Sequence, residues 1–117
     1  MKIKWKWVWF IWLLTVIILS LMPVNPSMQP RMLSGIKHLD KAVHFIMYLI
    51  LSFTMLKFMK EKKVKHSIWL VLLFCIILGV AIEFIQNTEM INRNFDIADI
   101  IANIIGTFVG AIIFRYT

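Results

Sequence analysis

Four long apolar stretches divide the chain, and they constrain its fold more than any other feature. They comprise residues 7–22, 42–58, 67–85 and 97–114. Each approaches the roughly 20 residues that a helix needs to cross a ~30 Å hydrocarbon core. None shows the alternation of apolar and polar residues that is typical of a membrane-spanning strand, and unpaired backbone is not tolerated in lipid. The sequence therefore predicts an all-α fold, an integral membrane bundle of four transmembrane helices.

The composition favours the same interpretation and leaves no room for a second domain. Of the 117 residues, 61% are hydrophobic and 16% are charged, whereas soluble domains are about half apolar and about a quarter charged. Four spans with short connections use up this length, so residues 1–117 are expected to form a single domain. Cys75 is the only cysteine in the sequence, which excludes an intrachain disulfide.

The first apolar stretch has a second possible interpretation. Lysines followed by an apolar run are also typical of a signal peptide. No small-x-small cleavage site follows Ser20, and Pro23 closes the run. We therefore expect a retained first helix.

Basic residues are distributed unevenly between the two ends of the expected helices. With the N-terminus inside, nine lie on the cytoplasmic side, namely Lys2, Lys4, Lys6, Lys57, Lys60, Lys62, Lys63, Lys65 and Arg115. Four lie outside, namely Arg31, Lys37, Lys41 and Arg93. The positive-inside rule then predicts a multi-pass protein with both termini in the cytoplasm. The inner lysines suit anionic lipid headgroups, and nucleic acid is a poor alternative.

All five tryptophans are expected near the same inner interface, where indole rings anchor helices. They are Trp5, Trp7, Trp9, Trp12 and Trp69.

Acidic residues gather at the opposite, outer side. Five of the six lie in the outer loops or at helix ends that open onto them, namely Asp40, Glu83, Glu89, Asp96 and Asp99. Steps of three or four residues place Asp40, Lys41 and His44 on one helix face, and Asp96, Asp99 and Asn103 on another. Such polar stripes avoid lipid, so they are expected to face each other and Glu83 inside the bundle.

Several polar or small residues also have a purely structural interpretation. Asp40 and Asp96 lie where helix N-caps are expected, and carboxylates there stabilise the first turn. Gly106 and Gly110 form a G-x-x-x-G pair that favours close helix packing, either within the chain or in a homo-oligomer. Tyr48 is expected in the core.

Three segments together resemble the VanZ-like family of small bacterial membrane proteins. They are DKAVHFIMYLILSF (40–53), GVAIEFIQ (79–86) and RNFDIADIIANIIGTFVG (93–110). The ordered pattern D-K-x-x-H-F, E-x-x-Q, R-x-x-D-x-x-D-x-x-x-N-x-x-G is far more specific than any one part. The resemblance implies a four-helix protein of the bacterial plasma membrane that is linked to tolerance of glycopeptides such as teicoplanin. It implies no particular reaction.

The candidate functional residues form one polar set near the outer leaflet: Asp40, Lys41, His44, Glu83, Gln86, Arg93, Asp96, Asp99 and Asn103. Two helix N-termini and the side chains of Lys41 and Arg93 favour an anionic headgroup. The carboxylates would repel a phosphate unless these side chains, a proton or a divalent cation neutralise them. A divalent cation is one candidate cofactor. Oxygen ligands suit Mg²⁺ or Ca²⁺, and His44 would allow Zn²⁺ or Mn²⁺.

Three classes of function fit these residues. The first, which we favour, is a protein that engages a lipid-linked cell-wall precursor or an acylated glycopeptide at the extracytoplasmic leaflet. The second is a membrane-embedded enzyme on a lipid-phosphate substrate with His44 and Glu83 as acid and base, although no catalytic motif accompanies them. The third is a proton or ion conductor, for which the helices offer no relay of ionisable residues from the outer site to the cytoplasm.

Overall fold

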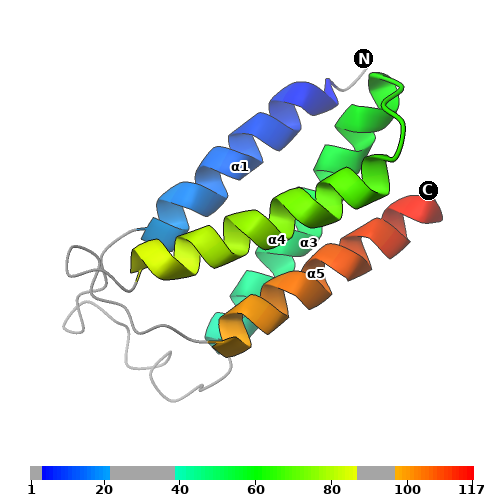
Figure 1. Cartoon of the computed structure of the whole chain (residues 1–117). Coiled ribbons are helices and arrows are strands. Elements are labelled where there is room, and N and C mark those ends of the chain that lie inside the picture. Colours follow the sequence, from blue (N-terminus) through cyan, green and yellow to red (C-terminus); the bar gives the residue numbers. More distant parts are fainter. Residues whose placement is uncertain (1–3, 22–38, 87–96) are drawn as a thin grey trace.

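The computed structural model describes residues 4–21, 39–86 and 97–117, and this part of the chain is almost entirely helical. Its helices are α1 (Trp5–Leu21), α3 (Leu39–Glu61), α4 (Ser67–Gln86) and α5 (Ile97–Arg115). Helices that follow one another run antiparallel, so both chain ends and the α3–α4 turn lie at one end of the bundle (Figure 1). The prediction of an all-α fold with four helices is confirmed.

The helix bounds agree with the apolar stretches to within two residues except in α3. This helix begins at Leu39 and ends at Glu61, three residues beyond the predicted stretch at each end. Lysine and glutamate are good helix formers, so the helix continues where the apolar stretch stops. Asp40 therefore lies in the first turn of α3, and its prediction as an N-cap is wrong.

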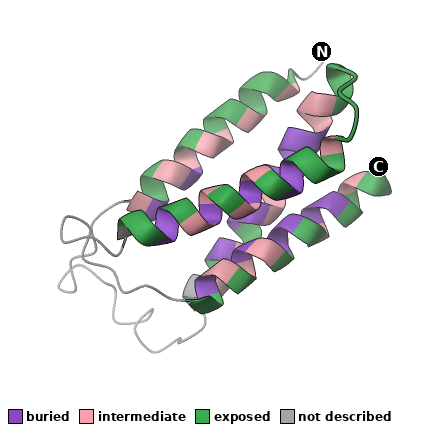
Figure 2. Ribbon diagram, in the orientation of Figure 1, coloured by how far each residue is buried: buried purple, intermediate pink, exposed green. Residues whose placement is uncertain are grey.

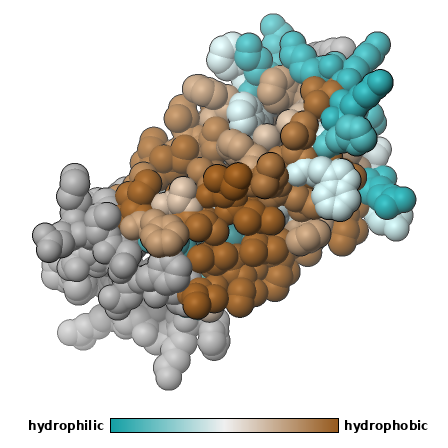
Figure 3. Space-filling model, viewed as in Figure 1, coloured by the Kyte–Doolittle hydropathy of each residue, from teal (hydrophilic) through white to brown (hydrophobic). Residues whose placement is uncertain are grey.

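Length and composition qualify three helices to cross a membrane: Lys41–Glu61, Ser67–Ile85 and Ile97–Arg115. The fourth, α1, has 17 residues and extends about 25 Å at about 1.5 Å per residue, somewhat less than a ~30 Å core. The outward faces of the helices are apolar, as at Ile77 and Ile112, which are more than half exposed. Figure 3 shows this surface as a brown band that gives way to teal at the end with the chain termini.

The four helices surround one core, with buried residues on their inward faces (Figure 2). The most extensive contact joins α3 to α5, while α1 packs against α3 and, less extensively, against α4. The core is built from Val16, Tyr48, Leu51, Leu56, Val71 and Cys75, all of them fully buried. Tyr48 thus lies in the core as predicted.

Two glycines of α5 permit its close approach to α3. A Cβ atom on Gly106 would fall on the backbone carbonyl of Phe45, and one on Gly110 would meet the Leu49 carbonyl and the Ser52 hydroxyl. Side chains at these positions would push the two helices apart. The prediction of close packing at this G-x-x-x-G pair is confirmed, and the neighbour is α3 of the same chain.

Two tryptophans of α1 pack within the bundle. The Trp12 indole N–H donates to the carbonyl oxygen of Met47 at 2.9 Å. The Trp9 ring stacks on Phe58 with 5.5 Å between ring centroids. These two tryptophans therefore hold α1 against α3, and the position of all five near the inner interface stays a prediction.

Candidate functional site

The ends of three helices bring the predicted polar residues to one end of the bundle. Lys41 and His44 lie in the first two turns of α3, Asp99 lies in the first turn of α5, and Glu83 lies in the last turn of α4. Because α4 runs opposite to α3 and α5, these positions share one level, at the end away from the chain termini (Figure 1). Counted along the helices, they lie within roughly 8 Å of the helix ends.

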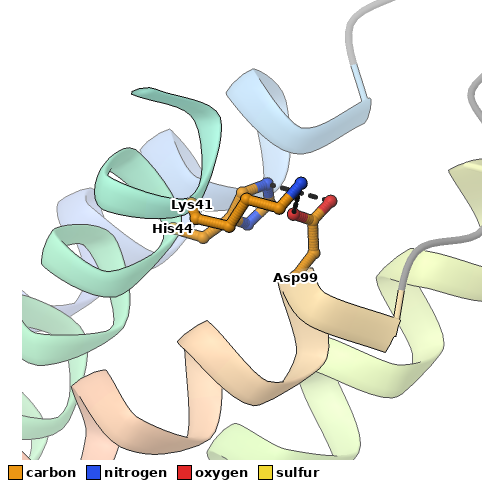
Figure 4. A network of polar contacts seen from close by, with 3 residues as sticks. All are labelled: Lys41, His44 and Asp99. Atoms are coloured by element: carbon orange, nitrogen blue, oxygen red, sulfur yellow. Dashed lines mark ion pairs between the residues drawn. The ribbon is translucent and has the colours of Figure 1, made fainter. Parts of the chain in front are cut away.

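Asp99 links α5 to two basic side chains of α3. The Lys41 Nζ atom lies 3.5 Å from Asp99 Oδ1, and the His44 Nε2 atom lies 3.8 Å from Asp99 Oδ2. Figure 4 shows both side chains directed at the same carboxylate. These distances exceed the 2.7–3.2 Å range of direct N–H···O hydrogen bonds, so the attraction is chiefly electrostatic.

Three of these four ionisable side chains are buried, so their charges are costly unless they are neutralised. His44, Glu83 and Asp99 are only 5%, 1% and 6% exposed, respectively, whereas the Lys41 side chain is 31% exposed. Withdrawing a carboxylate from water costs several kcal/mol, which opposite charge and hydrogen bonds must offset. Lys41 supplies one positive charge, and a protonated His44 or a bound cation would supply another.

His44, Glu83 and Asp99 could also hold a metal ion. Each offers one ligand atom, and these atoms all lie within 4.8 Å of one another. Ligand bonds of about 2.0–2.2 Å would require the most distant pair to come roughly 1 Å closer. One imidazole and two carboxylates suit Zn²⁺ or Mn²⁺ better than Ca²⁺, which takes six to eight oxygen ligands.

A second polar layer lies about one turn further into the bundle. The Asn103 side chain is 3% exposed and Tyr48 is fully buried. Neither the Asn103 Oδ1 atom nor the Tyr48 hydroxyl has a hydrogen-bond partner among the residues that the structure describes. A buried polar atom without a partner costs about 1–3 kcal/mol, so this layer is a natural position for a bound water or the polar group of a ligand.

Two residues that the sequence analysis did not single out belong to this deeper layer. A Cβ atom on Gly79 would lie 3.1 Å from the Asn103 amide nitrogen and 3.6 Å from the Tyr48 oxygen, so this glycine makes room for both. The Thr107 hydroxyl donates to the Asn103 carbonyl at 2.8 Å. Their spacing could have identified them, because residues four apart lie on the same face of a helix. Gly79 precedes Glu83 by four residues, and Thr107 follows Asn103 by four.

The structure thus brings together five of the nine predicted site residues, with Lys41, His44, Glu83 and Asp99 in one layer and Asn103 below them. The remaining four are Asp40, Gln86, Arg93 and Asp96. Asp40 and Gln86 belong to α3 and α4, but their side chains lie outside the described part of the chain, as do Arg93 and Asp96 entirely. Their roles stay predictions.

A family model described as VanZ/LLP1 matches residues 2–117, a range that contains every residue of the polar set. Searches among curated proteins and among solved structures found no match.

Proposed function

Because the chain belongs to the VanZ/LLP1 family, we propose that it is a membrane protein linked to glycopeptide tolerance. It engages a lipid-linked envelope component, or an acylated glycopeptide, at the extracytoplasmic leaflet of a bacterial plasma membrane. The observation that carries this proposal is the buried group of Lys41, His44, Glu83 and Asp99, which lies near one end of an otherwise apolar bundle. Ionisable residues that are buried within membrane helices are costly, and they are retained where they serve a function.

The position of this group suits an amphipathic ligand. The N-terminal ends of α3 and α5 lie beside it, and their partial positive charge attracts an anionic headgroup. Lys41 is the partly exposed member through which such a group would enter. The apolar side chains of Val43 and Ile101 are exposed within about a turn of the site, which supplies a surface for an acyl chain. One ligand would thus combine a polar head in the site and a chain along the bundle.

The proposal requires that the site face the outside. Cysteine labelling on a Cys75→Ser background tests this orientation. A cysteine introduced at Asn92 should react with an impermeant reagent added to intact cells, and one at Lys63 should react only after permeabilisation. The opposite pattern would reject a site at the outer leaflet.

Charge removal at the site tests the function itself. In a host whose glycopeptide tolerance depends on this protein, Glu83→Gln, His44→Ala and Asp99→Asn should each reduce the inhibitory concentration of teicoplanin to that of cells without the protein. Glu61→Gln is the matched control, because it removes the same charge from an exposed residue at the other end of α3. Normal protection in all three site variants would reject the proposal.

A purely structural role of Glu83 predicts a different pattern. Expression and detergent stability of Glu83→Gln would then fall together with protection, and neutralising Lys41 would restore both. Under the proposal, stability survives, because a neutral amide is cheaper to bury than a carboxylate.

The clustering of His44, Glu83 and Asp99 also favours a second candidate, an enzyme acting on a lipid-phosphate substrate with His44 and Glu83 as acid and base. Proton transfer requires groups within hydrogen-bond reach of the reacting atoms. Release of inorganic phosphate from a lipid phosphate by the purified protein, abolished in Glu83→Gln, would favour this alternative. Binding without turnover would favour the first candidate.

A further inference from the structure

A basic groove at the opposite end of the bundle is the strongest feature that the proposed function does not use. It lies between the end of α3, the α3–α4 turn and the end of α5. Its lining includes Lys60, Lys63, Ser67, Phe114 and Arg115. Segments far apart in the sequence thus bring three cationic side chains to one depression.

The α3–α4 turn gives the groove a defined edge. The Lys63 N–H donates to the Lys60 carbonyl at 3.1 Å, and the Val64 N–H donates to the Met59 carbonyl at 3.1 Å. Lys63 has a φ of 55°. These features make up a Schellman motif, which ends a helix with one residue in the left-handed conformation. The motif fixes the backbone of Lys63 relative to Lys60.

The beginning of α4 adds positive potential to the same groove. Ser67 is the first residue of this 20-residue helix and lines the groove, and the first turn of the helix contains no acidic residue. The free N–H groups of a helix N-terminus carry a partial positive charge and bind phosphate oxygens well. Glu61 is exposed and does not belong to the groove lining.

Aromatic rings place the groove where the apolar band ends. The Lys60 Nζ atom lies 5.9 Å from the centre of the Phe114 ring, which itself lines the groove. The Lys57 Nζ atom lies within 5.5–5.8 Å of three rings, those of Trp5, Phe53 and Phe114. An ammonium group over an aromatic ring makes a cation–π contact, and lysine and aromatic side chains are both typical of the headgroup level of a membrane.

We propose that this groove binds a phosphate group, and that an anionic phospholipid of the adjacent leaflet supplies it. The cations and the start of α4 would receive the phosphate oxygens, while the apolar face beside Phe114 would receive the acyl chains. Basic pockets between membrane helices recognise anionic headgroups in this way. The site is separate from the polar group around Asp99, so it would anchor or orient the bundle rather than engage the proposed extracytoplasmic ligand.

Native mass spectrometry of the purified full chain tests the proposal with phosphatidylglycerol and phosphatidylcholine as probes. The groove variant is the triple substitution Lys60→Gln, Lys63→Gln and Arg115→Gln. The matched control removes three charges from the same end but outside the groove, with Lys4→Gln, Lys6→Gln and Lys65→Gln. Circular dichroism and melting in detergent establish that both variants remain folded.

The expected result is selective retention of phosphatidylglycerol by the wild type and the control, with affinity about a hundredfold lower in the groove variant. Equal losses in both variants would overturn the proposal, because they would indicate only the general charge of this end. Displacement of the bound lipid by millimolar inorganic phosphate would overturn the assignment to a lipid and leave a site for the free anion. If the triple variant unfolds, Arg115→Gln alone, at the last residue of α5, should still weaken retention, and an unchanged affinity would reject the site.

Discussion

The substitution Gly106→Ala tests the closest contact in the bundle. In an exposed helix interior, replacing glycine by alanine stabilises a protein by about 1 kcal/mol, because alanine has the better helix propensity. At Gly106 the added methyl group would fall on the backbone carbonyl of Phe45. A backbone atom cannot rotate away as a side chain can, so α5 would have to move away from α3.

The net effect follows from two opposing contributions. Overpacking a buried site costs about 1–3 kcal/mol, and a backbone clash belongs at the upper end of that range. Subtracting a propensity gain of about 1 kcal/mol leaves an expected loss of about 2 kcal/mol in the free energy of unfolding. Gly79→Ala is the matched control, since its nearest neighbour is the Asn103 side chain at 3.1 Å. That side chain can shift slightly, so a net change near zero is expected.

Equilibrium unfolding in mixed micelles measures this difference. The sequence contains five tryptophans, whose fluorescence can follow unfolding as the fraction of denaturing detergent rises. A loss of about 2 kcal/mol corresponds to roughly a thirtyfold smaller ratio of folded to unfolded protein. If Gly106→Ala were as stable as the wild type, or more stable, the close approach of α5 to α3 would be refuted.

Two further substitutions have definite expected signs. Lys63→Gly should stabilise the protein by about 1 kcal/mol, because Lys63 has a φ of 55° and only glycine adopts this conformation without cost. Lys62→Gly is the control, since Lys62 has no positive φ, and it should not raise the melting temperature in detergent. Trp12→Phe should cost about 1 kcal/mol through loss of its hydrogen bond to the Met47 carbonyl. Trp69→Phe, at a 72% exposed residue, should be close to neutral in the same unfolding assay, and equal effects of the two substitutions would argue against that bond.

The number and approximate bounds of the helices could be predicted because a helix that crosses lipid needs a run of about 20 mostly apolar residues. Spacing alone also predicted that Asp99 and Asn103 share a face directed into the bundle, since a polar stripe has no favourable position in lipid. The pairing of Lys41 and His44 with Asp99 is consistent with that prediction.

Other features depend on how the helices are arranged relative to one another, and a local sequence pattern does not predict that arrangement. The spacing of Gly106 and Gly110 predicted a close neighbour but not that it is α3 of the same chain. The left-handed backbone conformation of Lys63 could not be predicted, because no glycine marks this position in the sequence. The basic groove requires Arg115 to meet the end of α3 across the bundle, and only the assembled structure brings them together.

The unequal contacts between helices have a mechanical consequence for the polar site. Lys41, His44 and Asp99 are carried by α3 and α5, whose backbones touch at the two glycines, so their mutual geometry is nearly fixed. Glu83 is carried by α4, which has less extensive contacts with both. A shift of α4 along its axis by one residue, about 1.5 Å, would move this carboxylate relative to Lys41, His44 and Asp99. The spacing between Glu83 and the other three side chains of this layer therefore depends on where α4 lies along its axis, whereas the spacing of those three depends on the glycine contact between α3 and α5.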